Sequence, residues 1–266
     1  MQNVHLLVID PQVDFCDPKG ALFVPGADED MQRLAAFVKR VQDKLTSIHV
    51  TLDSHHFVDV AHPIFWRDAN GKQPDPFTII SADDVRNGVW KTKRPSWQKR
   101  GQAYVEELEK NGRYPLCIWP PHCLIGSPGT QVMPCFFEAL TEWSKTSLKT
   151  IGWVTKGSNP LTEHYSGIQA DVPDPRDPST QINTGLIDVL TTADVILIAG
   201  EASSHCLANT VRDIANNFGD DSYVQKLWLL EDAASPVPTF EQFAEDFVKE
   251  MTGRGMKLTK TTEWMK

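Results

Sequence analysis

The chain has 266 residues, of which 41% are hydrophobic and 23% are charged, and its net charge is −9. This size and composition are typical of one large globular α/β domain, and no apolar run is long enough to span a bilayer. The acidic balance would repel a phosphate backbone, so we exclude both nucleic acid and membranes as partners.

Short apolar runs that end in polar or glycine residues predict strands buried on both faces of a sheet. In chain order they are Val4–Asp10, Ser47–Leu52, Thr150–Thr155, Val195–Ala199, Gln225–Leu230 and Gly255–Thr262. Apolar residues at helical spacing predict helices at Asp30–Leu45, Asn183–Leu190, Ser204–Phe218 and Thr239–Met251. This alternation predicts a three-layer α/β/α fold with a mostly parallel, roughly six-stranded sheet.

Residues from about 62 to 117 interrupt the alternation, because they are rich in Pro, Asp, Lys and Trp. Only Gln102–Asn111 has a helical pattern there, and a short strand is expected at Tyr114–Ile118. We interpret the segment as a long insertion within a single domain of residues 1–266. Insertions of this length commonly act as lids or binding elements.

The N-terminus has no basic segment followed by an apolar core, so no secretory signal is expected and a cytoplasmic location is predicted. The five cysteines are odd in number, widely spaced and without a Cys-x-x-Cys pair. This pattern argues against a disulfide framework and against a structural zinc knuckle. We expect reduced thiols.

Reactive side chains follow several of the predicted strands. Asp10, Asp53 and Lys156 each come directly after a strand, and Cys206 lies in the turn after the fourth. Taken singly, each has an ordinary explanation as a turn residue, a solvated charge or a small buried thiol. The carboxyl ends of parallel strands share one edge of the sheet, however, so these residues are expected to meet there.

Cys206 is the predicted nucleophile. A nearby Lys156 ammonium and a helix N-terminus would favour its thiolate, and Asp10 could accept the thiol proton and later donate it. The backbone amides of Ala202 and Cys206 could donate hydrogen bonds to an oxyanion. The other four cysteines lack a strand-end turn combined with a helix start.

Asp53-Ser-His55 is a candidate for metal binding, because residues two apart in an extended segment point to the same side. A carboxylate with an imidazole suits Zn²⁺, Fe²⁺ or Mn²⁺. A third ligand must come from elsewhere, and His56, His62 and His122 are the candidates. On its own, the pair is more often a surface Asp with a histidine.

Two motifs together resemble the nicotinamidase branch of the isochorismatase-like cysteine hydrolases. They are Asp10-Pro-Gln-Val-Asp-Phe15 and Trp119-Pro-Pro-His-Cys-Leu-Ile-Gly-Ser-Pro-Gly129. The resemblance extends over about residues 4–62 and 117–235. It implies the isochorismatase-like hydrolase fold, and a catalytic triad that falls on Asp10, Lys156 and Cys206.

The resemblance also implies one divalent metal ion, with Zn²⁺ as the first choice and Fe²⁺ or Mn²⁺ as alternatives. Its ligands would be Asp53, His55 and His122, and His62 is an additional candidate because some members of the family add a histidine after the pair.

Two further parts of the site follow from the resemblance. Members of the family form an oxyanion hole around a cis peptide, which would be Glu201–Ala202 here. Their substrate-ring contacts map to Phe15 and Trp119, and we add Tyr165 and His205 as candidates for the pocket wall. Aromatic walls would enclose a pyridine ring.

The activity implied is that of a metal-dependent cysteine amidohydrolase that converts nicotinamide to nicotinate and ammonia through a thioester, as in NAD salvage and pyridine nucleotide biosynthesis. One alternative is a related cysteine hydrolase acting on another small amide, carbamoyl or ureido compound. A non-enzymatic alternative is a small-molecule binding protein on the same fold. The insertion and the segment after Lys156 depart from the family, so the amide and the formation of a homo-oligomer stay open.

Overall fold

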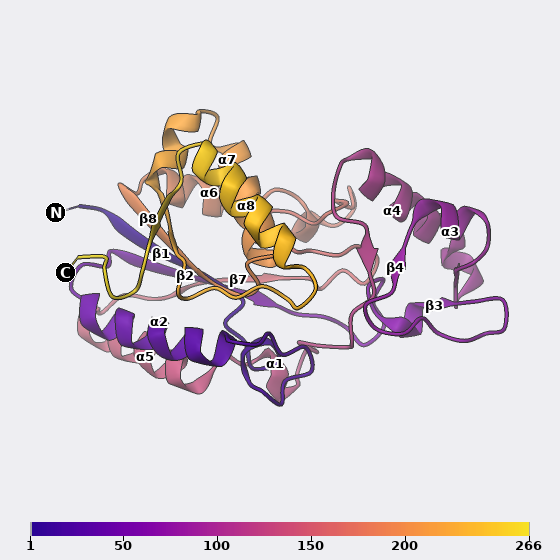
Figure 1. Cartoon of the computed structure of the whole chain (residues 1–266), viewed down its shortest axis with the longest axis horizontal. Coiled ribbons are helices and arrows are strands. Elements are labelled where there is room, and N and C mark those ends of the chain that lie inside the picture. The colour runs from indigo at the N-terminus through magenta and orange to yellow at the C-terminus, as the bar shows by residue number, and fades with distance from the viewer. Residues whose placement is uncertain (1, 266) are drawn as a thin grey trace.

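The computed structural model describes residues 2–265. Its centre is a six-stranded sheet in the order β10-β9-β8-β1-β2-β7, and every neighbouring pair is parallel (Figure 1). The strands are β1 (Val4–Ile9), β2 (Ser47–Asp53), β7 (Gly152–Lys156), β8 (Val195–Gly200), β9 (Leu227–Leu230) and β10 (Lys257–Thr259). The predicted fold class is confirmed.

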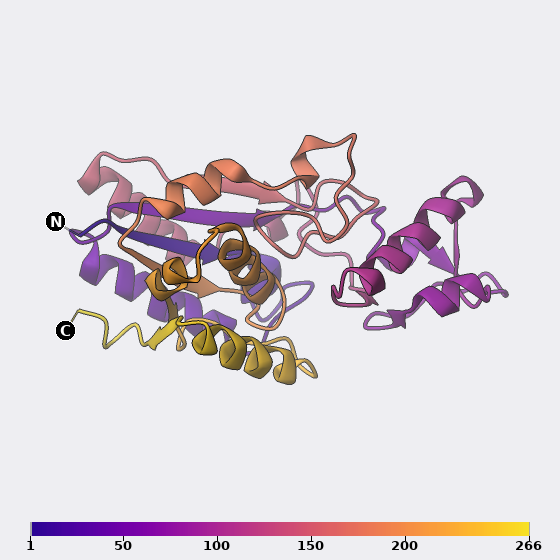
Figure 2. The ribbon, with the colours of Figure 1, turned by 90° about the horizontal axis from the view of Figure 1, so that it is seen from above.

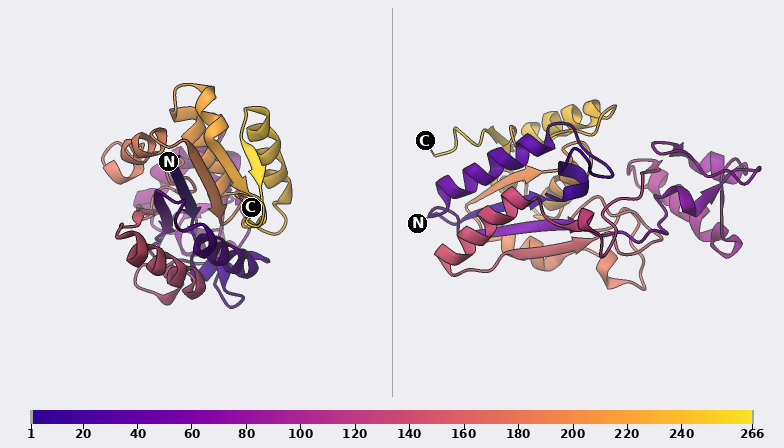
Figure 3. Two further views of the ribbon diagram at one scale, coloured as in Figure 1. Left: turned by 90° about the vertical axis from the view of Figure 1, so that its left-hand side faces the viewer. Right: turned by 90° about the horizontal axis from the view of Figure 1, so that it is seen from below.

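Helices cover both faces of the sheet (Figures 2 and 3). One face carries α2 (Ala27–Val41) and α5 (Pro134–Ser147); the other carries α6 (Thr184–Thr191), α7 (Cys206–Asn217) and α8 (Glu241–Gly253). Because both faces are covered, β1 and β8 are buried at every residue, as continuous apolar runs predict. Within residues 2–265, none of the helices is both long and apolar enough to cross a membrane.

Helix α5 lies outside the predicted elements. Its buried residues Phe136, Leu140 and Trp143 do have helical spacing, so the signal was present in the sequence. Another unpredicted element is α1 (Val13–Cys16), a single turn after β1. Short 3₁₀ helices occur at Pro63–Phe65, Pro95–Trp97, Pro128–Thr130, Pro178–Thr180 and Asp221–Lys226. Four of these helices begin at proline, whose fixed φ suits a first helical position.

Residues 63–117 form a lobe beside the carboxyl edge of the sheet (Figure 1). It contains α3 (Ala82–Arg86), α4 (Gln98–Lys110) and two antiparallel pairs. The pairs are β3 (Trp66–Arg67) with β5 (Lys91–Thr92), and β4 (Ile79–Ile80) with β6 (Leu116–Cys117). The expectation that only residues 102–111 are helical is wrong, because Ser81 and Asp84 form a capping box that starts α3.

The register of the parallel strands places the carboxyl ends of neighbouring central strands side by side. Ile9 of β1 lies beside Gly200 of β8, and Asp53 of β2 lies beside Lys156 of β7. Chain segments that are far apart in sequence therefore leave the sheet at one edge, where Asp10 and Cys206 follow directly.

Candidate active site

Lys156 contacts the two other residues that are predicted to be catalytic, Asp10 and Cys206. Its Nζ lies 2.9 Å from Oδ2 of Asp10 and 3.6 Å from Sγ of Cys206. The carboxyl group of Asp10 is fixed on its other side by Thr51, whose Oγ1 donates to Asp10 Oδ1 at 2.5 Å and accepts from the Asp10 amide at 3.0 Å. All four side chains are inaccessible or nearly so. The structure therefore brings the predicted trio together in a buried cluster.

The same ammonium connects this trio to the candidate metal site. Lys156 Nζ lies 3.0 Å from Oδ1 of Asp53. Burial alone would lower the pKa of Lys156, but the carboxylates of Asp10 and Asp53 outweigh it and raise that pKa well above its usual range. Lys156 is therefore a permanent cation between two carboxylates, and it cannot serve as the proton acceptor.

The pKa of the Cys206 thiol differs from the expectation, because it is raised and not lowered. Burial raises its pKa well above the ordinary value; the Lys156 ammonium acts in the opposite direction, but nearby carboxylates, Asp10 first, add to the increase. The predicted lowering by Lys156 and the helix start is thus overcome, and the resting thiol is protonated. Attack requires a base, and the pKa of Asp10, which burial raises despite Lys156, suits that task.

The segment before Cys206 has the geometry of an oxyanion site. The peptide bond between Glu201 and Ala202 is cis, as the resemblance predicts. The carbonyl of Ala202 accepts hydrogen bonds from the amides of His205 and Leu207. Among residues 2–265, by contrast, no acceptor is bonded to the amides of Ala202 and Cys206. These two donors remain available for a ligand oxygen.

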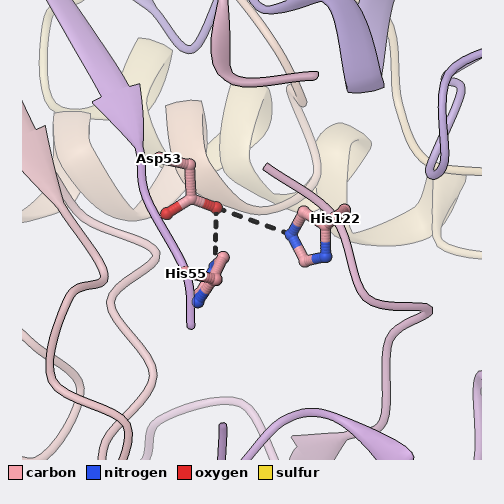
Figure 4. Close-up of side chains that lie close together, drawn as sticks. All are labelled: Asp53, His55 and His122. Atoms are coloured by element: carbon pink, nitrogen blue, oxygen red, sulfur yellow. Dashed lines mark hydrogen bonds and ion pairs between the residues drawn. The ribbon is translucent and has the colours of Figure 1, made fainter. Parts of the chain in front are cut away.

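Asp53, His55 and His122 form a compact cluster (Figure 4), in which one potential ligand atom of each lies within 4.8 Å of the others. Nε2 of His55 is 3.0 Å, and Nε2 of His122 is 3.5 Å, from Oδ2 of Asp53. Charge from His55 and Lys156 overcomes the effect of burial and holds the pKa of Asp53 well below its usual range. A deprotonated carboxylate facing two imidazole nitrogens fits a divalent metal ion.

Hydrogen bonds behind the two imidazoles set their orientation. Nδ1 of His55 lies 3.3 Å from Oδ2 of Asp59, and Nδ1 of His122 lies 2.9 Å from the carbonyl oxygen of Pro120. Each ring therefore directs Nε2 toward Asp53, which is the arrangement that metal-ligating histidines use.

The two other histidine candidates lie outside the converging ligand atoms. The ring of His62 packs against His55 and His122, with centroids 5.3 and 5.7 Å away, and its Nδ1 is 3.2 Å from the Phe57 carbonyl oxygen. His56 is exposed to solvent. In the described part of the chain, the group that could hold a metal consists of Asp53, His55 and His122.

A pocket opens above Cys206 between the trio and the metal cluster. The four residues predicted to contact a substrate ring, Phe15, Trp119, Tyr165 and His205, all line it. Trp119 Nε1 donates to the Tyr165 hydroxyl at 2.9 Å, and the ring of Phe15 packs edge-on against His122. The other lining residues are Leu22, Asp53, His122, Glu163, Ala202, Cys206 and Val237.

Comparison with known proteins agrees with this fold and site. No protein-family model matches the chain. A curated nicotinamidase of Escherichia coli (strain K12) is 25% identical over 260 residues, which span 97% of this chain and 95% of the relative. The chain is therefore similar to a nicotinamidase over nearly its whole length.

Solved structures share the isochorismatase-like fold over nearly the whole chain. A nicotinamidase/pyrazinamidase of Acinetobacter baumannii has a TM-score of 0.66 at 19% identity, with 98% of each chain covered. The yeast nicotinamidase has a TM-score of 0.65 at 19% identity, covering 96% of this chain and 99% of its own. A zinc complex of Pyrococcus horikoshii pyrazinamidase has a TM-score of 0.56 at 20% identity, covering 97% and 99%.

One residue of this candidate site was not predicted. Glu163 is buried in the pocket wall, with Oε1 3.9 Å from Nε2 of His55, and its Oε2 has no hydrogen-bond partner within residues 2–265. Burial raises the pKa of Glu163 to about 8; His55 opposes this, and the carboxylates of Asp59 and Asp53 add to it. The position of Glu163 two residues before Tyr165 was the available signal.

Two side chains of the first motif have positioning roles that sequence reasoning did not assign. The side-chain Oε1 of Gln12 accepts from the Asp53 amide at 2.7 Å, and its Nε2 donates to the Asp53 carbonyl at 2.8 Å. Asp14 Oδ2 accepts from the Cys123 amide at 2.6 Å. A Cβ atom on Gly129 would lie 2.0 Å from the same Asp14 oxygen, so only glycine fits there. The two motifs are therefore packed on each other.

Proposed function

We propose that this chain is a metal-dependent cysteine amidohydrolase that converts nicotinamide to nicotinate and ammonia. One observation carries the proposal: Lys156 Nζ lies within 3.6 Å of Cys206, Asp10 and Asp53 at once, so the candidate nucleophile and the candidate metal cluster face a single pocket. The nicotinamidase and pyrazinamidase relatives support the choice of substrate.

The pocket suits a flat heteroaromatic amide. Trp119, Tyr165 and Phe15 offer apolar and edge contacts to a ring. Asp53, His55 and His122 would hold the divalent ion, for which Zn²⁺ is our first choice because the Pyrococcus horikoshii relative is a zinc complex. A cation held there would offer positive charge to the ring nitrogen of the substrate.

Acylation begins with the thiol. Asp10 accepts the Cys206 proton, and the sulfur attacks the carboxamide carbon, whose oxygen becomes an oxyanion held by the Ala202 and Cys206 amides. The C–N bond then breaks as Asp10 returns the proton to nitrogen, and ammonia leaves. Lys156 stabilises the negative charge that moves between sulfur and carboxylate.

Deacylation repeats these steps with water. Asp10 accepts a proton from water, and the oxygen attacks the thioester carbon. The tetrahedral intermediate collapses, the C–S bond breaks, and the Cys206 thiol recovers its proton from Asp10. The product leaves as nicotinic acid and loses its carboxyl proton to solvent to give nicotinate, so Asp10 alternates between base and acid in each half of the reaction.

Ammonia release tests the proposal directly. The purified protein should release ammonia from nicotinamide and pyrazinamide, and Cys206→Ala should reduce turnover on the order of 10⁴-fold or more. Cys135→Ala is the matched control, because this half-buried thiol lies on α5 away from the pocket. Release from ureido or carbamoyl compounds alone, or full activity of the Cys206 variant, would contradict the proposal.

A further inference from the structure

A carboxyl group lies directly behind the candidate oxyanion site. Glu201, at the start of the segment that leads to Cys206, is completely buried and is not among the residues that line the pocket. Its Oε2 accepts a hydrogen bond from the Ser235 amide at 3.0 Å, whereas its Oε1 finds no donor within residues 2–265. The residue thus faces the protein interior rather than the substrate.

The group opposite Glu201 is a second carboxyl group. Asp30 of α2 is joined to Glu201 through Ser235, whose amide donates to Glu201 and whose hydroxyl donates to Asp30. Asp30 already receives Arg33 Nη2 at 2.6 Å on Oδ1 and the Ser235 hydroxyl at 2.5 Å on Oδ2. Both carboxyl oxygens of Asp30 thus have donors, which holds Asp30 and Ser235 in fixed positions behind Glu201.

The segment around Glu201 is bonded to Ile9 of β1, whose carbonyl accepts from the Glu201 amide at 2.8 Å, and to residues 233–237. The Gly200 amide donates to the Ala233 carbonyl, and the Ser203 amide donates to the Ser235 carbonyl, both at 2.9 Å. Ser204 accepts at Oγ from the Val237 amide at 3.0 Å. The Glu201 side chain adds a bond to Ser235, whose hydroxyl in turn bonds to Asp30 of α2.

We propose that Glu201 is a positioning residue for the oxyanion site, an inference that rests on the proposed amide hydrolysis. The Ser235 amide holds its side chain and the Ser235 hydroxyl bonds to Asp30, so residues 200–206 are fixed against residues 233–237 and α2. The Ala202 and Cys206 amides keep their direction as a result.

Because the side chain of Glu201 can ionise, its positioning role is expected to be lost at high pH. Burial, and then the charge of Asp30, raise its pKa well above the usual range, with Arg33 opposing. The other titratable group nearby is Cys16 on α1, whose own pKa is raised by burial and then by Glu201. A raised pKa means that the folded chain keeps the proton at neutral pH and loses it only as pH rises, when two carboxylates would repel each other.

Variants at position 201 test this role through the pH profile. Glu201→Gln keeps the size and a donor but cannot ionise, so kcat should stay within about threefold of wild type at neutral pH, without the alkaline fall due to Glu201. Glu201→Leu should lower kcat about 10- to 100-fold with little change in KM, because oxyanion donors act mainly in the transition state. Glu29→Gln, an exposed acid on α2 that contacts Arg33, is the matched control and should behave as wild type.

The possible outcomes separate this inference from the proposed function. A wild-type protein that hydrolyses no amide would overturn the function, and hydrogen exchange at residues 200–206 would then still report positioning, with faster exchange expected in Glu201→Leu. Active wild type with unchanged kcat in Glu201→Leu, or the same alkaline limb in Glu201→Gln, would overturn the role of Glu201. If Glu201→Leu does not fold, the Glu201→Gln profile decides.

Discussion

The edge of the central sheet and the lobe of residues 63–117 differ in which side chains they bury and in how far away in sequence the partners of those side chains lie. At the sheet edge, Asp10, Asp53 and Lys156 are polar, buried and held by partners far away in sequence. The lobe is local in sequence, and it leaves apolar side chains such as Phe77 and Val89 about half exposed. Burial of charge thus coincides with the long buried strands, which can supply fixed partners on every side.

The lobe reaches the site through a few contacts only. The hydroxyl of Tyr104 accepts from the Glu163 amide at 3.1 Å, Arg100 pairs with Asp174 at 2.9 Å, and the ring of Phe77 meets Trp119 edge-on. The contacts of Tyr104 and Phe77, and those of the Tyr114 ring with Tyr165 and His205, touch the pocket wall, whereas Asp174 lies outside it. The difference implies that the sheet edge determines the chemistry, whereas the lobe shapes the entrance.

The largest effect should come from removing a metal ligand at the sheet edge. His122→Ala should reduce bound divalent metal by at least about tenfold and abolish most ammonia release, because second-shell changes alone cost 10- to 100-fold. Elemental analysis of the purified protein measures this without reference to activity. His56→Ala, which removes the exposed neighbour of His55, should leave the metal content unchanged; equal losses in both variants would contradict the assignment.

A core change in the lobe should affect stability more than chemistry. Trp66 is fully buried and packs closely against Gly101, so Trp66→Ala should cost about 4 kcal/mol. Hydrogen exchange should rise mainly within residues 63–117, with kcat of the folded protein falling less than about tenfold. Exchange that rises equally in β1 would show that the lobe and the sheet form one cooperative unit.

The smallest effect expected is that of a hydroxyl at the sheet edge. Thr51→Val removes the bond that helps to hold down the pKa of Asp10, worth about 1 kcal/mol. The acid limb of the pH–rate profile should therefore move to higher pH, with kcat at neutral pH several-fold lower. Thr155→Val changes an exposed threonine on β7 and should leave the profile where it was.

The strands and helices of the central sheet could be predicted because their apolar patterns extend over many residues. The strand ends predicted the meeting of Asp10, Lys156 and Cys206, and the Trp-Pro-Pro-His motif added His122. Thr51 and Glu163 were missed, because their roles lie in tertiary contacts that no local pattern encodes. In the lobe, the strand expected at Tyr114–Ile118 contains β6, whereas β3, β4 and β5 have two residues each, too few for any periodicity to be visible.

The order of the site residues along the chain has a consequence during protein synthesis. Asp10, Asp53, His55 and His122 all leave the ribosome before Lys156, and Cys206 leaves last among the site residues. An unfinished chain can therefore present the carboxylates and imidazoles of the rim but no nucleophile. The reactive thiol enters only when its cationic neighbour and its proton acceptor have already been made, so a product that terminates before residue 206 lacks the nucleophile.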